Sequence, residues 1–546
     1  MKSIKNKKMK NCGSVLIMAM ILIVICSALA VSISGMSNAN IQLASNHQKV
    51  NTALSAAQSG LECCKYFIKT LTLPSTNRNK ISDSDSDQVW SVLCQKLQET
   101  RFDNKNVPAA GRFIDTHGNG DQVVASDLSY DDQSKFTLRF YRYDNEPNII
   151  TIQSIGTCGE TTKKVTMSML LAKESKVLTY AVAGKGRMWL TGQSTIHGDV
   201  FSTWNRPEIS PFNMTSDSAV MGTINTVLTL DQIKEHHYQL ETLNEAGQPI
   251  DQYGHPIGAD YEDRYYSEDD EIKAYHEGIN YDQPDSDMPG MSISDYDTSQ
   301  YGAMTTEIPA CPTSQREVEY FPHSAGNYNY PRDGTPYRTS NLKLTRHVYE
   351  NETFTNAKLP SNRNALFRNC TFEEVLYIDC AENTNSYYNN VRFENCTFNG
   401  VIVTDVPDSF KWMQNCLYFT GEANFENTSS IQEATILAPH FNVNLGNTNP
   451  EQSENNVITG AIIGGIVDVR GNAQIYGTII SMCDTSQWSS GYVTNIGATL
   501  DDGGSETTEV GDVGVIDITP DKDQMLPSGI RSPIIIKTLQ NTYSEG

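Results

Sequence analysis

The sequence has little positive charge and lacks the motifs that mark nucleotide enzymes and zinc proteins. Its 546 residues contain 41 Lys and Arg against 65 Asp and Glu, so the formal net charge is −24. A phosphate backbone repels such a chain, and no basic cluster lies beyond the first eleven residues, which excludes nucleic acid as an expected partner. The 12 cysteines form no CxxC pair, so we expect no structural zinc site. No metal ion and no cofactor is predicted.

The N-terminus carries a basic leader followed by an uncharged segment. Residues 1–11 contain five lysines and no acid, and the 19 residues 15–33 contain no charge. A helix of that length just spans a hydrocarbon layer of about 30 Å. Lysines favour the cytoplasmic side, so we expect a single pass through the inner membrane, with the N-terminus cytoplasmic and the bulk of the chain periplasmic or extracellular. The expected anchoring side chains are Val15, Leu16, Ile17, Ile21, Leu22, Ile23, Val24, Ile25, Leu29, Val31 and Ile33.

Three interpretations of this segment are open. A cleaved secretory signal would use the Ala28-Leu29-Ala30 pattern. A lipoprotein would use Cys26, although Ile25 stands where a small residue is expected. The third interpretation is one helix over residues 15–72, because apolar residues recur at three- and four-residue steps and no proline appears before Pro74.

A resemblance supports the third interpretation. The leader ends in Gly13, Ser14-Val15-Leu16-Ile17-Met18-Ala19 follows, and residues 54–62 read LSAAQSGLE. In these features the chain resembles type IV pilins and pseudopilins, most closely PilX-type minor pilins. The resemblance implies that a prepilin peptidase cuts between Gly13 and Ser14, and that the mature helix contacts the membrane and other pilin-like subunits. Many pilins have Glu where this chain has Met18, which favours a minor or membrane-retained role.

Changes of pattern along the chain define its organisation. The expected fold is an α+β pilin-like part, with a long helix and a small antiparallel sheet, followed by an all-β right-handed parallel β-helix. Within the chain, residues 251–297 carry 14 acids against two basic residues, which suits either a solvated flap or a surface for calcium or a cationic partner. The expected segments are a basic leader (1–13), the transmembrane and long helix (14–74), an α+β head (75–176), the first solenoid rungs (177–204), an acidic insertion (205–345), the main solenoid (346–484), and a tail with a cap strand at 534–536 (485–546).

A repeat indicates the β-helix. Phe367-Arg368-Asn369-Cys370-Thr371-Phe372 recurs 26 residues later as Phe393-Glu394-Asn395-Cys396-Thr397-Phe398. Repeats of this length, built from short strands, bury their apolar side only by stacking coil on coil. We expect Cys370, Phe372, Cys396 and Phe398 to face the core, and Asn369 and Asn395 to form corners, because asparagine tolerates the left-handed conformation. Cys370 stacked on Cys396 would form a buried thiol ladder, with a disulfide and a metal site as alternatives.

Two classes of function fit these features. The first is a non-catalytic, membrane-anchored pilin-like protein that exposes the β-helix for pilus or secretion-system assembly or for adhesion, with a surface polysaccharide as a further partner. The second is a β-helix polysaccharide lyase or glycosidase, which needs carboxylates on one exposed face. Its candidates, Asp379, Asp405, Asp468 and Arg470, form no recognisable motif. We therefore expect no enzymatic activity and no catalytic residue.

Overall fold

In the computed structural model of the protein, the chain forms two compact units. The first contains Met1–Pro74, Ser82–Ala172 and Ile536–Gly546, and the second contains Ser75–Ile81 and Lys173–Ile535. Both segments of the second unit are therefore flanked in the sequence by segments of the first. The structure describes residues 12–78, 80–100, 102, 105–174, 176–190, 193–207, 211–214, 218–232, 242–243, 249–250, 275–284, 290–320, 343–361, 363–380, 389–410, 415–425, 436–446, 456–470, 473–484, 493–497, 515–521 and 526–546.

Helix α1 runs without a break from Cys12 to Lys69. Its 58 residues correspond to about 87 Å at a rise of 1.5 Å per residue. The helix predicted over residues 15–72 is therefore confirmed to within three residues at each end. The basic residues of the leader, 1–11, lie outside the described residues.

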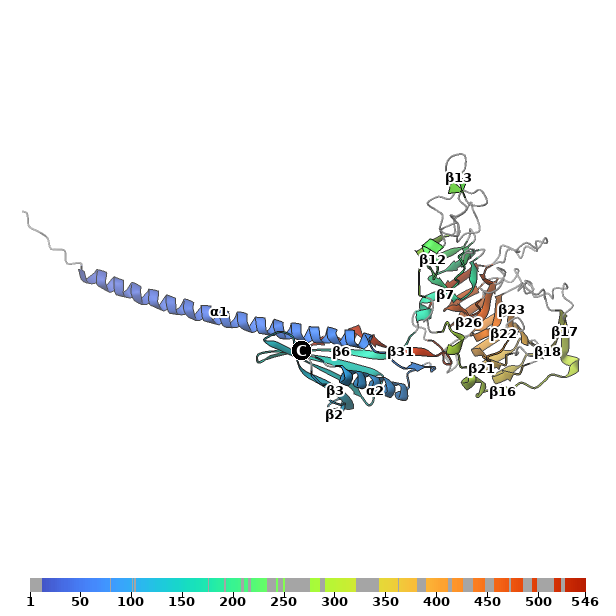
Figure 1. Ribbon diagram of the computed structural model, residues 1–546, viewed down its shortest axis with the longest axis horizontal. Coiled ribbons are helices and arrows are strands. Elements are labelled where there is room, and N and C mark those ends of the chain that lie inside the picture. The colour runs from blue at the N-terminus through green and yellow to red at the C-terminus, as the bar shows by residue number, and fades with distance from the viewer. Residues whose placement is uncertain are drawn as a thin grey trace, which may run out of the picture. The chain divides into compact units, whose positions relative to one another are not determined.

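The rest of the first unit is built on an antiparallel sheet, along which α1 runs (Figure 1). Its successive strands pair with one another in chain order, and each of these pairings is antiparallel. A second helix, α2 (Asp83–Glu99), begins at a capping box in which Ser82 and Asp85 bond to each other's backbone N–H. The strands are β2 (Gly111–Asp115), β3 (Gly118–Ser129), β4 (Ser134–Tyr143), β5 (Ile149–Cys158) and β6 (Thr161–Lys173).

Small residues let α1 lie close on β4 and β5. Ala53 and Ala57 of the helix are fully buried. A Cβ added to Gly156 of β5 would lie 2.0 Å from the carbonyl oxygen of Ala53, and one added to Gly60 would lie 2.3 Å from Ser154 Oγ. At Gly156 the strand backbone therefore touches the helix backbone, and at Gly60 the helix backbone touches a strand side chain; only glycine permits either contact.

The second unit is built on a sheet of 22 strands. Strands of neighbouring coils pair in parallel, so the arrangement is β-helix-like; among the described residues, the antiparallel pair in this sheet is β17 with β18. The strands are β7 (Tyr180–Gly184), β8 (Arg187–Leu190), β9 (Gln193–Ile196), β10 (Asp199–Ser202), β11 (Phe212–Met214), β12 (Ala219–Thr226), β15 (Tyr275–Asn280), β16 (Thr306–Glu307), β17 (Arg316–Tyr320), β18 (Lys343–Glu350), β19 (Thr353–Leu359), β20 (Ala365–Arg368), β21 (Thr371–Ile378), β22 (Asn389–Thr404), β23 (Asn415–Phe425), β24 (Ile436–Gly446), β25 (Asn456–Thr459), β26 (Ile462–Arg470), β27 (Ala473–Tyr476), β28 (Ile479–Ser481), β29 (Val493–Ile496) and β30 (Val515–Thr519).

Two columns of aromatic rings fill part of the core. Successive ring centroids are 5.0, 5.5 and 5.0 Å apart in the first column and 5.4, 5.2 and 4.7 Å apart in the second. Rings stack within a column and meet edge to face between columns, an arrangement worth about 0.5–1.5 kcal/mol per pair beyond burial. The first column is Tyr349, Phe367, Phe393 and Phe419, and the second is Phe354, Phe372, Phe398 and Phe425.

Asparagines form a corner between these columns. Asn351, Asn369 and Asn395 lie on consecutive coils and have φ values of 55°, 48° and 52°. Asparagine adopts this left-handed conformation more readily than most residues, so it turns the chain from one side of the coil to the next. The cysteines that follow two of these corners, Cys370 and Cys396, are 1% and 2% exposed.

The coils do not stack in chain order. The coil of β7, β8 and β9 pairs on one side with β10, β11 and β12 and on the other with β28, β29 and β30. We call the junction between β7–β9 and β28–β30 the seam. Leu190 pairs with Ile496 across it, and both are fully buried, so the core continues through the seam. The coil that comes first in the sequence, β7–β9, therefore lies inside the stack. One of its two neighbours, β28–β30, comes from a part of the sequence near the C-terminus.

A connecting segment makes this order feasible. Residues 290–308, which we call the strap, bond in turn to Met482, Thr404 and Lys358. These partners lie on coils progressively farther from the seam, so the strap carries the chain to the end of the stack where β18 begins. Tyr296 and Tyr301 of the strap are buried against the outer side of the sheet.

The strand pairing corrects two predicted segments. Residues 205–345 are not separate from the rungs, because β11 and β12 stack on the first coil, β15 stacks on β12 and β17 pairs with β18. The main stack does not end at residue 484, because β29 and β30 complete the seam. These strands are so short that their alternation of apolar and polar residues cannot be distinguished from the sequence of a loop. The most acidic part of the insertion, 251–274, lies outside the described residues.

The predicted cap strand at 534–536 is also corrected. These residues belong to β31 (Ser532–Thr538), which stands in the antiparallel sheet, next to β6 and to β1 (Ser75–Thr76). The final strand, β32 (Ser544–Glu545), pairs with β6 as well. An apolar run of this kind can pair with any open strand edge, and the open edge here belongs to β6.

The coil order predicts a specific cross-link. Thr195 and Asp517 are in-register partners across the seam, and in-register neighbours lie about 4.8 Å apart, within disulfide range. The full-length double variant Thr195→Cys/Asp517→Cys should therefore form a disulfide within one chain on mild oxidation, detected by peptide mapping. The control variant Thr195→Cys/Gln474→Cys places the cysteines two coils apart and should not cross-link. Equal cross-linking of both pairs would contradict this order of coils.

Candidate functional site

The N-terminal half of α1 presents an apolar surface. All eleven expected anchoring side chains are exposed, with Val15 at 66% and Ile33 at 64%. An 18-residue window of the helix has a mean hydropathy of 2.9 with none of it buried, so the helix is long and apolar enough to cross a membrane. Transfer of one such side chain out of water is worth about 1.5–3 kcal/mol. A membrane anchor and a signal sequence both have this character.

The expected processing site lies at the start of the same helix. Gly13 and Ser14 are in the first turn of α1, which begins at Cys12, and Ser14 is exposed. Met18 follows one turn later and is 75% exposed. The apolar surface therefore starts immediately after the bond between Gly13 and Ser14, with no carboxylate in its first turns.

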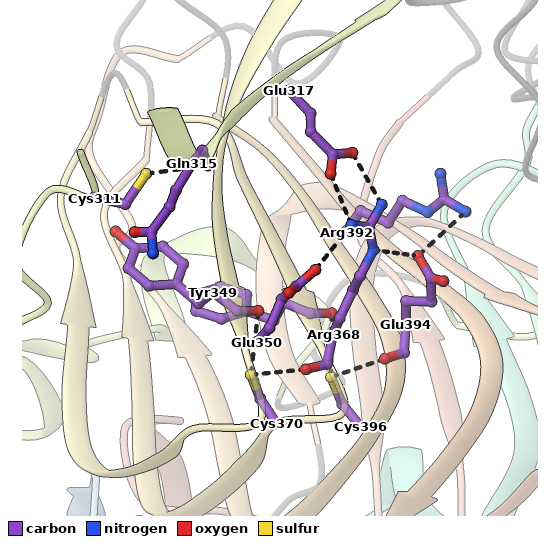
Figure 2. Close-up of polar contacts among 11 residues, drawn as sticks. Cys311, Gln315, Glu317, Tyr349, Glu350, Arg368, Cys370, Arg392, Glu394 and Cys396 are labelled. Atoms are coloured by element: carbon purple, nitrogen blue, oxygen red, sulfur yellow. Dashed lines mark hydrogen bonds and ion pairs between the residues drawn. The ribbon is translucent and has the colours of Figure 1, made fainter. Parts of the chain in front are cut away.

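The cysteines of the repeat are buried free thiols. Figure 2 shows the Cys370 thiol donating to the Tyr349 carbonyl and lying beside the Arg368 carbonyl, and the Cys396 thiol next to the Glu394 carbonyl. Burial raises the pKa of both thiols, that of Cys396 to about 12. A thiol that is buried and resists ionisation is a poor nucleophile and a poor metal ligand. The two side chains thus act as small core residues and not as a reactive pair.

Arg368 lies at the centre of three carboxylates (Figure 2). It pairs with Glu317 through both guanidinium Nη atoms, at 2.7 and 2.9 Å. It also contacts Glu350 at 3.0 Å and Glu394 at 3.2 Å, which are its in-register neighbours on β18 and β22. The hydrogen bond that Arg368 donates to Glu317 is the largest of several influences that raise the pKa of Arg368. Because Glu317 belongs to β17, this cluster fastens the antiparallel strand to the end coils.

The structure brings together two of the four candidate catalytic residues. Asp379 and Asp405 follow β21 and β22 at equivalent positions of consecutive coils, and each backbone N–H donates to the preceding coil at 2.9 Å. Lys358 Nζ lies 2.9 Å from Asp379 Oδ1, and Tyr377 OH donates to Asp405 Oδ1 at 3.4 Å. Burial and, among smaller influences, the nearby charge of Asp379 raise the pKa of the Asp405 carboxyl.

Asp468 does not join this pair. Asp468 is 8% exposed and lies on another side of the stack, in register with Asn444 and Asn495. Arg470 ends β26, and its side chain lies outside the described residues. In the part of the chain that the structure describes, no three His, Cys, Asp or Glu side chains gather as metal ligands would.

The Arg368 cluster was not predicted, although part of its signal is present in the sequence. Glu350 precedes Arg368 by 18 residues and Glu394 follows it by 26, and these separations are one coil each. A search for opposite charges at coil spacing would have found this triplet. Glu317 would still have been missed, because β17 pairs antiparallel to β18 and follows no repeat.

Comparisons with known proteins find similarity to a solved structure. No family model matches the chain, and no curated protein matches it. The chain is similar to the crystal structure of the competence-associated pilin ComZ from Thermus thermophilus, with a TM-score of 0.26 and 12% sequence identity over 91% of this chain and 98% of that chain. A likeness at that score carries no argument about fold or function.

The close contact of α1 with β5 predicts the effect of one added side chain. Gly156→Val should displace the helix from the sheet and destabilise the first unit by about 2–4 kcal/mol, because its Cβ would overlap the Ala53 carbonyl. Urea unfolding of the full-length chain, followed by hydrogen exchange of the β4 and β5 amides, measures this. Gly111→Val, on β2 with nothing within 4 Å of the added Cβ, is the matched control. Equal losses for both variants would contradict the proposed contact.

The carboxylates around Arg368 predict a second effect. Arg368→Met should remove the counter-ion that Glu317, Glu350 and Glu394 share, leaving Glu394 only its contact of 3.8 Å with Arg392. We expect this to destabilise the end of the stack by about 1–3 kcal/mol. It should also speed proteolysis within β17. Arg363→Met, which removes one ion pair with Glu307, serves as the control and should cost less. If the two variants unfold and are cleaved alike, the cluster does not fasten β17.

Proposed function

We propose that this protein is a membrane-anchored, pilin-like structural protein of the minor pilin or pseudopilin kind, closest to the PilX type. The observation that carries the proposal is α1, a single helix of 58 residues with two different halves. Its first half exposes apolar side chains, whereas Ala53, Ala57 and Gly60 in its second half are packed on an antiparallel sheet. These two halves are what we expect of a helix that first crosses a membrane and then packs on a folded head.

The proposal includes processing and partners. A prepilin peptidase cuts between Gly13 and Ser14, and the rest of α1 stays on the mature protein as its anchor. The anchor crosses the inner membrane with its N-terminus cytoplasmic, as the leader lysines favour, and the bulk of the chain is periplasmic or extracellular. Neighbouring pilin-like subunits contact the helix. Met18 provides no carboxylate for a neighbour's N-terminus, so the protein acts as a minor or membrane-retained subunit.

The parallel sheet is the part that faces outward in this proposal. We infer a right-handed β-helix that serves as a surface for pilus or secretion-system assembly or for adhesion, with a surface polysaccharide as one partner. The burial of Cys370 and Cys396 and the involvement of Arg368 in ion pairs support a structural role for the repeat. The function proposed here is not enzymatic.

One observation favours a second candidate function, a β-helix polysaccharide lyase or glycosidase. Asp379 is paired with Lys358, whereas the pKa of Asp405 is raised. The two carboxyls therefore differ in environment, as the general base and the general acid of such an enzyme do. The test is release of reducing or unsaturated ends from neutral and acidic polysaccharides by the full-length protein. Activity that Asp405→Asn abolishes would establish the enzyme, and no activity on any polymer would reject it.

The anchor proposal predicts the mature N-terminus. Protein isolated from its native host should begin at Ser14, because the peptidase removes the leader and retains the helix. N-terminal sequencing measures this, and Gly13→Val should block the cut while Gly35→Val, farther along the exposed helix, should not. A chain that begins at Val31 would show a cleaved signal, and an intact Met1 would show a plain anchor; either result would overturn pilin-type processing.

A further inference from the structure

One side of the parallel sheet remains open to solvent. It consists of the outward-facing residues of β25, β27, β30 and β9, which we call the open row. Val457, Thr459, Tyr476, Thr519 and His197, at and just beyond the ends of these strands, are exposed. On the side of the sheet that the strap covers, by contrast, the outward-facing residues are buried. The inward residues between them, Ile458, Ile475, Ile518 and Ile196, are fully or almost fully buried and stack in register.

The open row carries almost no net charge, although the chain as a whole has −24. Its carboxylate, Asp517, lies 3.5 Å from His197 Nε2, and its other outward side chains are hydroxyl, amide, aromatic or aliphatic. An acidic polymer would gain no counter-charge here and would be repelled by the rest of the chain. The charge of the surface therefore suits a neutral partner.

An exposed aromatic ring lies within this row. Tyr476 is 45% exposed and has Thr459 and Thr519 as in-register neighbours on either side. The carbon–hydrogen face of a sugar ring is apolar and packs on an aromatic face, while its hydroxyls bond to side-chain hydroxyls and amides. Thr459, Thr519 and Gln474 supply such groups around the ring.

The spacing of the row favours a polymer over a single small molecule. Equivalent side chains recur from coil to coil at about 4.8 Å, so the surface offers similar polar groups at regular steps in a straight line. A linear chain of repeating sugar units can follow such a line and bond at successive steps. A compact ligand would use only one step of it.

We propose that the open row binds a neutral polysaccharide, with the ring of Tyr476 as its stacking platform. This inference rests on the proposed function, in which the parallel sheet faces a surface outside the membrane. It names the class of polymer and the side of the sheet that contacts it. Binding needs neither Asp379 nor Asp405, which lie on the side near the strap.

The test is affinity electrophoresis of the full-length protein in detergent, in gels that contain hydroxyethyl cellulose, galactomannan or polygalacturonate. The wild-type chain should be retarded by at least one of the two neutral polymers and not by polygalacturonate. Tyr476→Ala should weaken the retardation about tenfold or more, while Tyr476→Phe should keep it, because the ring and not the hydroxyl makes the contact. Tyr130→Ala, which removes an exposed ring from the other unit (42% exposed), is the matched control and should bind as the wild type.

Three results would overturn the proposal: no retardation by either neutral polymer, retardation only by polygalacturonate, or equal binding by Tyr476→Ala and the wild type. Circular dichroism of each variant separates lost binding from lost folding, and Tyr476→Phe provides the folded variant that must still bind. Sequencing of the mature N-terminus is unaffected by these outcomes. Failure of the glycan site and failure of the pilin proposal are therefore distinguishable.

Discussion

In-register stacking between coils is the interaction on which the second unit depends. No coil has enough apolar surface to form a core alone, so each inward residue is buried by the residue at the same position one coil away. Tyr349, Phe367, Phe393 and Phe419 form such a column, which continues through Leu445, Val469, Ile496, Leu190 and Met214. A shift of one residue would turn every inward side chain outward, so the pairing has little freedom.

The seam shows that this interaction does not require chain continuity. Coils from residues 180–196 and 479–518 pair as regularly as coils that follow each other in the sequence. To pair, two coils need only strand edges whose inward-facing and outward-facing residues alternate in the same register. The strap meets the remaining requirement, since it carries the chain along the stack while Tyr296 and Tyr301 cover outward-facing apolar residues.

In the first unit, a long helix is packed on a folded head along only half of its length. The other half makes no contact within the described part of the chain. Small residues at Ala53, Ala57 and Gly60 bring the helix onto β4 and β5, where Gly156 makes room for it. The exposed half needs no partner inside the chain, because its apolar side chains are suited to a membrane. In the proposed function, this half of the helix is the anchor and the stack of coils presents a surface outside the membrane.

Local periodicity in the sequence determined the long helix, the corners at Asn369 and Asn395, and the core positions of Phe372 and Phe398, because each depends on residues close together in the chain. Which strand edges meet was decided only by the tertiary structure. The seam joins segments about 300 residues apart. The antiparallel strand β17 is held by Arg368 through a glutamate outside the repeat, and β31, which contains residues 534–536, lies beside β6. Parallel pairing accepts any strand of suitable alternation, so the choice of neighbour depends on the whole chain being packed at once.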